Sequence, residues 1–306
     1  MLSEPAKGVA AMVGTCTIWG LSSLYYKLLA DLPSAEVLSH RMIWSLVFFG
    51  IVLAVQRRLG AVIRAINSWQ AFWRVALAAL MIGINWWLFI WSVQVGQITQ
   101  SSLGYYIFPL VAVVIGRVVF GERLSRLQWL AVGLATAAVA ILTFGLGVFP
   151  WIALTLAVTF GIYGLLKKQL AVGPVVSVTA EALLLAPLAV VVLLQTHHNG
   201  GTFWGGDVQR FLLLTLSGPL TAVPLILFSY AARRLTMTSI GLLQYLNPTL
   251  QFACAVFVFA ELFGAWHVAA FALIWTALAL YSGVAWRQDR ARRSAARAAA
   301  VSGTAV

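Results

Sequence analysis

Charged residues are scarce in this sequence. They make up 9% of the 306 residues, whereas hydrophobic residues make up 62%. A soluble domain carries about 25% charged residues, so this chain has too few of them to cover a water-facing surface. The composition excludes a soluble globular protein and predicts an all-α integral membrane protein with the lipid bilayer as its surroundings.

Acidic residues and cysteines are also few. Eight Asp and Glu stand against 20 Lys and Arg, which gives a net charge of +12. The basic residues lie in short clusters between apolar runs, which is the pattern of membrane topology rather than of a nucleic-acid-binding stripe. Cys16 and Cys254 lie in apolar segments without CxxC spacing, which indicates reduced core cysteines. We therefore expect neither a nucleic-acid partner nor a metal site.

Motifs for nucleotide or hydrolytic chemistry are absent. The sequence contains no P-loop, no paired-aspartate diphosphate site, no HExxH and no GxSxG. Their absence argues against an ATP-driven pump and against a membrane-embedded hydrolase. We expect a protein that is not an enzyme and that uses no cofactor.

Long apolar runs fill most of the chain. A membrane-spanning helix needs about 20 mostly apolar residues, and by this measure the sequence predicts ten of them. They lie near 8–29, 34–55, 72–93, 98–120, 127–145, 149–169, 174–195, 211–232, 236–259 and 265–286.

The two halves of the chain resemble each other. Matched residues lie 141 residues apart early in each half and 139 apart later, and five predicted helices fall in each half. An odd number of helices makes the second copy enter the membrane from the opposite side, so the sequence predicts two inverted five-helix repeats, as in many secondary transporters. We place the repeats at 1–145 and 146–286, followed by a basic tail at 287–306. The matched pairs include Gly20 and Gly161, Lys27 and Lys168, Tyr106 and Tyr245, Pro109 and Pro248, and Glu122 and Glu261.

The basic residues predict the orientation. With the N-terminus in the cytoplasm, 17 of the 20 Lys and Arg fall on the inner side. The positive-inside rule therefore predicts that both termini are cytoplasmic. In this orientation the segment 197–209 is periplasmic.

Four segments of the sequence resemble a known family. WGLSSLYYKLL, PSAEVLSHRMIWS, SLGYYIFPL and LLQYLNPTLQF together resemble RarD-type proteins, which belong to the EamA-like branch of the drug/metabolite transporter superfamily. The resemblance spans 5–287. It implies a ten-helix carrier of the bacterial inner membrane with a cavity lined mainly by predicted helices 1, 3, 4, 6, 8 and 9, and with helices 5 and 10 at the periphery. One departure is Phe108, where the family usually has a small or polar residue.

Aromatic and amide side chains provide the candidate solute contacts. Rings combined with a few amides suit an amphipathic or cationic organic solute, through stacking and cation–π contact. Trp and Tyr also anchor helices at membrane interfaces, but the residues chosen here include several that lie deep in their spans. The candidate substrate-binding residues are Tyr25, Asn85, Trp86, Tyr105, Tyr106, Gln244, Tyr245 and Asn247.

Three ionisable residues lie inside predicted spans. A charged side chain at this depth costs at least ~2.5 kcal/mol if it meets lipid, so His40, Arg41 and Glu181 are expected to face the bundle. They are candidates either for proton coupling and solute pairing or for a structural ion pair. Histidine is included because its ordinary pKa lies near neutrality.

Two prolines and two glutamates are matched between the repeats. Pro109 and Pro248 lie near the middle of their spans, where a proline bends the helix and frees a carbonyl that can line a cavity. They are expected to kink their helices. Glu122 and Glu261 follow the ends of the same spans, and capping or bridging to a neighbouring loop is their expected role.

Two functions remain open. The first is a secondary transporter, and by resemblance an exporter, of small organic solutes such as metabolites, amino acids or drugs, working by alternating access. The second is a non-transporting membrane module, such as a sensor or an assembly partner, with an inherited inverted-repeat fold. The sequence encodes neither the identity of the solute nor the oligomeric state.

Overall fold

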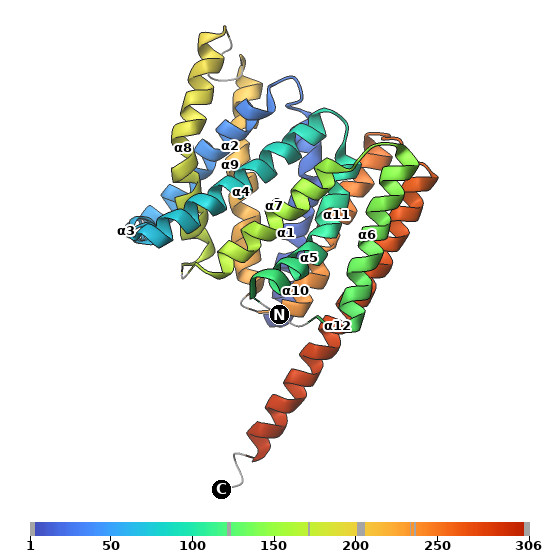
Figure 1. The fold of residues 1–306 in the computed structure, drawn as a ribbon. Helices are drawn as coiled ribbons and strands as arrows, with labels where there is room; N and C mark the ends of the chain where they lie inside the picture. Colours follow the sequence, from blue (N-terminus) through green and yellow to red (C-terminus); the bar gives the residue numbers. More distant parts are fainter. Residues whose placement is uncertain are drawn as a thin grey trace.

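The protein is a bundle of helices. The computed structural model describes residues 4–120, 124–170, 172–200, 206–232, 234–235 and 237–302, and all regular secondary structure in those residues is helical (Figure 1). The elements are α1 (Glu4–Lys27), α2 (Ser34–Val55), α3 (Gly60–Ala65), α4 (Trp69–Gln94), α5 (Ile98–Phe120), α6 (Arg126–Leu146), α7 (Trp151–Lys168), α8 (Pro174–His198), α9 (Val208–Ala232), α10 (Met237–Gln244), α11 (Leu246–Ala253), a π-helical segment (Cys254–Val258) and α12 (Ala265–Ser302).

Eight helices are long and apolar enough to cross a membrane: α1, α2, α4, α5, α6, α8, α9 and α12. Two of the ten predicted spans coincide with shorter apolar helices, which cover Trp151–Lys167 and Leu242–Val258. The short helix α3 was not predicted, and its Val62 and Ala65 are buried against α8. The structure therefore has eight candidate spans in the residues that it describes.

Local sequence signals set several helix ends. Ser125 and Gln128 form a capping box at the start of α6, and Ser68 accepts a hydrogen bond from the backbone of Ala71 at the start of α4. These side chains satisfy amide groups that have no partner within the helix. Gly147, with a φ of 68°, ends α6 in the left-handed region that favours glycine.

The segment predicted as a single span at 236–259 is interrupted. α10 ends at Gln244, α11 begins at Leu246, and the chain continues as a π-helical segment from Cys254. Pro248 lies in the first turn of α11, where the missing amide of proline is tolerated. π-Helical turns commonly occur at functional sites, and this one leads directly to Glu261.

Glycines allow the central helices to approach one another closely. A Cβ atom on Gly104 of α5 would lie 2.7 Å from the carbonyl oxygen of Ala153 on α7, and one on Gly218 of α9 would lie 2.7 Å from that of Trp44 on α2. Small residues at such crossings let helices pack in a membrane, where the hydrophobic effect does not drive their association.

Two helices lie together at one side of the bundle. α6 packs chiefly against α12, and Figure 1 shows the pair beside the other helices. Small alanines and a few large residues of both helices share one buried cluster with α5 and α7. Beyond the bundle α12 continues as a helix to Ser302, so the tail predicted from residue 287 is helical as far as that residue.

Candidate functional site

A buried arginine lies at the junction of four helices. Arg41 of α2 is only 6% exposed. Its Nη1 donates to the hydroxyl of Tyr26 on α1 at 2.8 Å, and its Nε donates to Oγ1 of Thr221 on α9 at 3.0 Å. The guanidinium also lies over the ring of Trp86 on α4, 3.9 Å from the ring centroid. Neutral oxygens and an aromatic face therefore hold this charge in the interior.

A second polar group lies between α4, α5 and α7. The fully buried Asn85 donates through Nδ2 to the carbonyl oxygen of Leu156 and to Oγ1 of Thr159, each at 2.9 Å. Its Oδ1 accepts a hydrogen bond from the hydroxyl of Tyr105 at 2.9 Å. The amide thereby connects three helices, and the predicted contact of Asn85 and Tyr105 with a solute stays a prediction.

Aromatic rings connect the two halves of the interior. Tyr26 packs edge-on against Phe89, Phe89 against Tyr105, and Tyr105 against Phe160, with centroids 5.8–6.0 Å apart. Phe160 then lies 6.0 Å from Tyr163. These five side chains come from α1, α4, α5 and α7, so a series of rings leads from the neighbourhood of Arg41 to that of Glu181.

Glu181 belongs to a buried cluster that contains an ion pair. It is 2% exposed, and its Oε1 lies 2.6 Å from Nζ of Lys167 on α7. Ser177 donates to Oε1 at 2.7 Å, and Tyr163 donates to Oε2 at 3.1 Å. Of the alternatives open for Glu181 in the sequence, this geometry fits an ion pair between α8 and α7, and the predicted role in proton coupling stays a prediction.

His40 is buried next to Arg41 in the sequence. It is 3% exposed, and its Nε2 has no hydrogen-bond partner among the residues that the structure describes. It is therefore not part of the cluster around Glu181, although the two residues are matched in the repeat. The structure brings Arg41, Trp86 and Tyr26 together, whereas His40 and Glu181 belong to separate surroundings.

The remaining candidate solute contacts lie in other surroundings. The hydroxyl of Tyr25 donates to the carbonyl oxygen of Leu213 on α9 at 2.7 Å. Tyr106 hydrogen-bonds to Thr249 at 2.7 Å and packs edge-on against rings of α12. Tyr245 packs against the same cluster as Tyr106. Tyr106 and Tyr245 thus both pack against this cluster, and their predicted contact with a solute stays a prediction.

The amides near the break between α10 and α11 are less enclosed. Gln244 and Asn247 are both partly buried. Oδ1 of Asn247 accepts a hydrogen bond from Gln251 at 3.0 Å, and the backbone carbonyl of Asn247 lies where a Cβ on Gly20 would come within 2.9 Å. Asn247 is thus at the contact between α11 and α1. Pro109 lies inside α5, and Pro248 is buried in α11.

Glu261 has a role that sequence reasoning left general. Its Oε1 accepts from the amide of Ile98 at 2.6 Å, and its Oε2 accepts from the amide and the hydroxyl of Thr99, each at 2.7 Å. A carboxylate at a helix N-terminus satisfies free amides and complements the helix dipole. Glu261 therefore connects the end of the π-helical segment to the start of α5. Its repeat partner, Glu122, lies outside the described residues.

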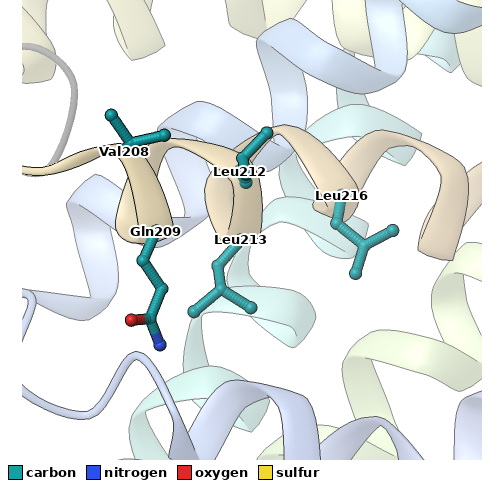
Figure 2. A pocket seen from close by; sticks show the side chains of 5 residues that line it. All are labelled: Val208, Gln209, Leu212, Leu213 and Leu216. Carbon is teal, nitrogen blue, oxygen red and sulfur yellow. The ribbon is translucent and has the colours of Figure 1, made fainter.

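A hollow of about 620 Å³ lies along α9, and it is apolar. Figure 2 shows its lining side chains on successive turns of that helix. Val208, Leu212 and Leu216 are all strongly exposed, as expected for side chains that face lipid in a membrane span. This surface is therefore distinct from the polar interior around Arg41. In the part of the chain that the structure describes, no group of three or more His, Cys, Asp or Glu could hold a metal ion.

Known proteins that resemble this chain are transporters or RarD proteins of bacteria. The EamA-like transporter family matches residues 6–144. The chain is 41% identical to the protein RarD of Streptomyces exfoliatus over 97% of its own length and 95% of that protein. It is 40% identical to the uncharacterized transporter YojE of Bacillus subtilis (94% and 97% covered) and 38% identical to the protein RarD of Escherichia coli K12 (91% and 94% covered).

One solved structure supports the fold. A crystal structure of a protein with 17% sequence identity superimposes with a TM-score of 0.60, covering 89% of this chain and 96% of that one. At this identity the likeness extends to the fold alone. Together with the eight candidate spans, these findings define a multi-pass membrane transporter of a bacterial family. The chain belongs to the EamA-like transporter family and is one of its RarD-type members.

Proposed function

We propose that the protein is a secondary transporter that exports small organic solutes, such as metabolites, amino acids or drugs, across the bacterial inner membrane by alternating access. The observation that carries this proposal is the buried polar and aromatic interior around Arg41, Asn85 and Tyr105. Ionisable and amide groups inside a membrane bundle are costly and mark solute or ion pathways. The transporter names of several relatives agree with a protein that is not an enzyme.

The proposal includes ten spans in two inverted repeats, 1–145 and 146–286. It is supported by the way in which corresponding helices pack. α1 packs against α9 and α11, and its repeat partner α7 packs against α4 and α5, the partners of those helices. α2 packs against its own partner α8, and α6 against its own partner α12. An approximate two-fold axis through the interior would produce this pattern.

We further propose that both termini are cytoplasmic. The distribution of Lys and Arg supports this orientation, and the start of α1 and the end of α12 lie on the same side of the bundle in Figure 1. An even number of spans is required for this arrangement. Export as the direction of transport rests on the family resemblance.

The alternative is a membrane sensor or assembly partner that moves no solute. Purified protein reconstituted into liposomes separates the two functions. We would first screen amino acids, aromatic metabolites and drugs for thermal stabilisation, and then measure uptake of the stabilising compounds with and without a pH gradient. A transporter moves at least one of them faster than empty liposomes do, and a sensor binds without uptake.

The same assay tests proton coupling. If His40 or Glu181 carries protons during transport, the pH gradient changes the uptake rate, and Glu181→Gln reduces that change while solute binding persists. Equal rates with and without the gradient would contradict coupling and leave facilitated diffusion.

A further inference from the structure

The charge of Arg41 is not balanced by any acidic side chain that the structure describes. No carboxylate of these residues lies within 4.0 Å of its nitrogens, and its hydrogen bonds go to the hydroxyls of Tyr26 and Thr221. A guanidinium keeps its charge in proteins, so a permanent positive charge remains in the interior of the bundle. Such charges normally have a counter-ion, because an isolated ion is strongly disfavoured in an apolar environment.

The other described acids near the bundle mostly have partners of their own. Glu181 pairs with a lysine, Glu261 accepts the amides at the start of α5, and Asp31 pairs with Arg210. Glu36, five residues before Arg41 on the same helix, forms no ion pair with it. The described residues therefore provide no counter-ion for Arg41.

We infer that Arg41 binds the carboxylate of the transported solute, and that the rings beside it hold the solute's apolar body. This inference deepens the proposed function by assigning the charge class of the solute. A guanidinium presents a planar pair of N–H groups that matches a carboxylate in a bidentate way. Such a solute also neutralises the interior while it is bound.

The geometry leaves the required donors free. Two of the five N–H groups of a guanidinium are used by Tyr26 and Thr221, and the structure gives Nη2 of Arg41 no hydrogen bond to any residue that it describes. Trp86 covers one face of the guanidinium at 3.9 Å. A carboxylate therefore approaches from the edge, where it meets Nη1 and Nη2, while Trp86 keeps the plane in place.

The same geometry disfavours a cationic solute. The ring of Trp86 would be a good cation–π surface, but Arg41 already lies over it. A second cation at this point would be repelled by the guanidinium in a medium of low dielectric constant. The ring of Tyr26 contacts that of Phe89, which in turn contacts that of Tyr105. These rings favour an aromatic or apolar body attached to the carboxylate.

Binding to the full-length protein in lipid nanodiscs tests the inference. The probes are benzoate, phenylacetate and indole-3-acetate, each compared with its uncharged amide, with benzylamine as the cation and sodium chloride as the inorganic anion control. The variants are Arg41→Gln, Arg41→Lys and, as a matched control, Arg210→Gln, which removes a partly exposed arginine that is paired with Asp31.

We expect at least one aromatic carboxylate to bind wild type and Arg210→Gln equally, and to bind Arg41→Gln at least about tenfold more weakly, because a charge-assisted hydrogen-bonded pair is lost. Arg41→Lys keeps the charge and loses the paired donors, so its affinity should fall between the two. Amides and benzylamine should bind wild type more weakly than the carboxylates. If Arg41→Gln does not fold, the affinity of Arg41→Lys and the preference of wild type for carboxylates over amides and benzylamine still test the inference.

Three results would overturn the inference: amides that bind as tightly as carboxylates, carboxylates that bind Arg41→Gln with unchanged affinity, or stabilisation by chloride equal to that by carboxylates. If amines or amides enter proteoliposomes while carboxylates neither bind nor enter, the carboxylate assignment is wrong and the transporter stands. If no compound of the set binds or enters, the carboxylate assignment fails, and the wider screen of amino acids, metabolites and drugs decides whether the protein is a transporter.

Discussion

The buried ion pair between Lys167 and Glu181 should respond unequally to the loss of its two members. Removing one partner of a buried pair costs about 3–5 kcal/mol, because the other charge is left uncompensated. Lys167→Met leaves Glu181, which is 2% exposed, with only the hydroxyls of Ser177 and Tyr163. We expect the free energy of unfolding of Lys167→Met to fall by the full amount, about 3–5 kcal/mol.

Glu181→Gln should cost roughly half as much. The side chain of Lys167 is 22% exposed, so its ammonium group can extend along its methylene stem towards water. The amide of the glutamine can still accept a hydrogen bond from Tyr163. In the double variant no buried charge remains, and its stability should return to within about 1–2 kcal/mol of wild type.

Unfolding in mixed micelles by titration with a denaturing detergent measures these free energies for all four proteins. We expect a coupling free energy of about 4 kcal/mol between the two sites, which is the sum of the two single losses less the loss of the double variant. This is larger than is usual for residues in direct contact, because each single variant leaves a charge uncompensated. Single variants that are equally destabilised, and whose effects simply add, would refute the reasoning. That result would mean that the two side chains do not form an ion pair in the membrane protein.

Three further predictions follow from the geometry. Glu261→Gln should lower the free energy of unfolding by about 2 kcal/mol, because one of the two oxygens that receive the amides of α5 becomes a donor; the same detergent titration measures this, and an unchanged midpoint would contradict the contact. Tyr106→Ala should cost about 3 kcal/mol, whereas Tyr106→Phe, which keeps the packed ring, should cost about 1 kcal/mol; equal losses would mean that the ring is not packed. In a variant whose native cysteines are replaced, a cysteine at Asn199 should react with a membrane-impermeant thiol reagent in intact cells and one at Arg64 should not, and the reverse pattern would invert the orientation.

The all-helical class and the eight candidate spans could be predicted from composition and from the apolar runs. Apolar runs identify spans because the bilayer thickness fixes the length of a helix that crosses it. The break at Tyr245 and the later π-helical segment could not be predicted this way, since the run 236–259 has the length of a single membrane span and mostly apolar residues. Helix interruptions depend on how neighbouring helices pack. Here α11 packs closely against Gly20 of α1.

The residues of the candidate site could also be predicted only in part. Asn85 and Arg41 could be recognised because polar groups inside a span must be satisfied by other helices. Their partners could not, since Thr221 and Leu156 are far away in the sequence. The sequence grouped Arg41 with His40 by adjacency, whereas neighbouring residues on a helix point in different directions. A lone acid, such as Glu261, carries no sequence signal for the helix terminus that it caps.

Counterflow in proteoliposomes tests the central claim, alternating access, most directly. Liposomes containing the protein are loaded with an unlabelled solute that binds it, and entry of the same labelled solute is measured from a dilute outside solution. A carrier that alternates between two faces predicts a transient accumulation of label above the outside concentration, absent from empty liposomes. Entry of label at the rate seen in empty liposomes, in spite of binding, would contradict the account and leave a protein that binds solutes without moving them.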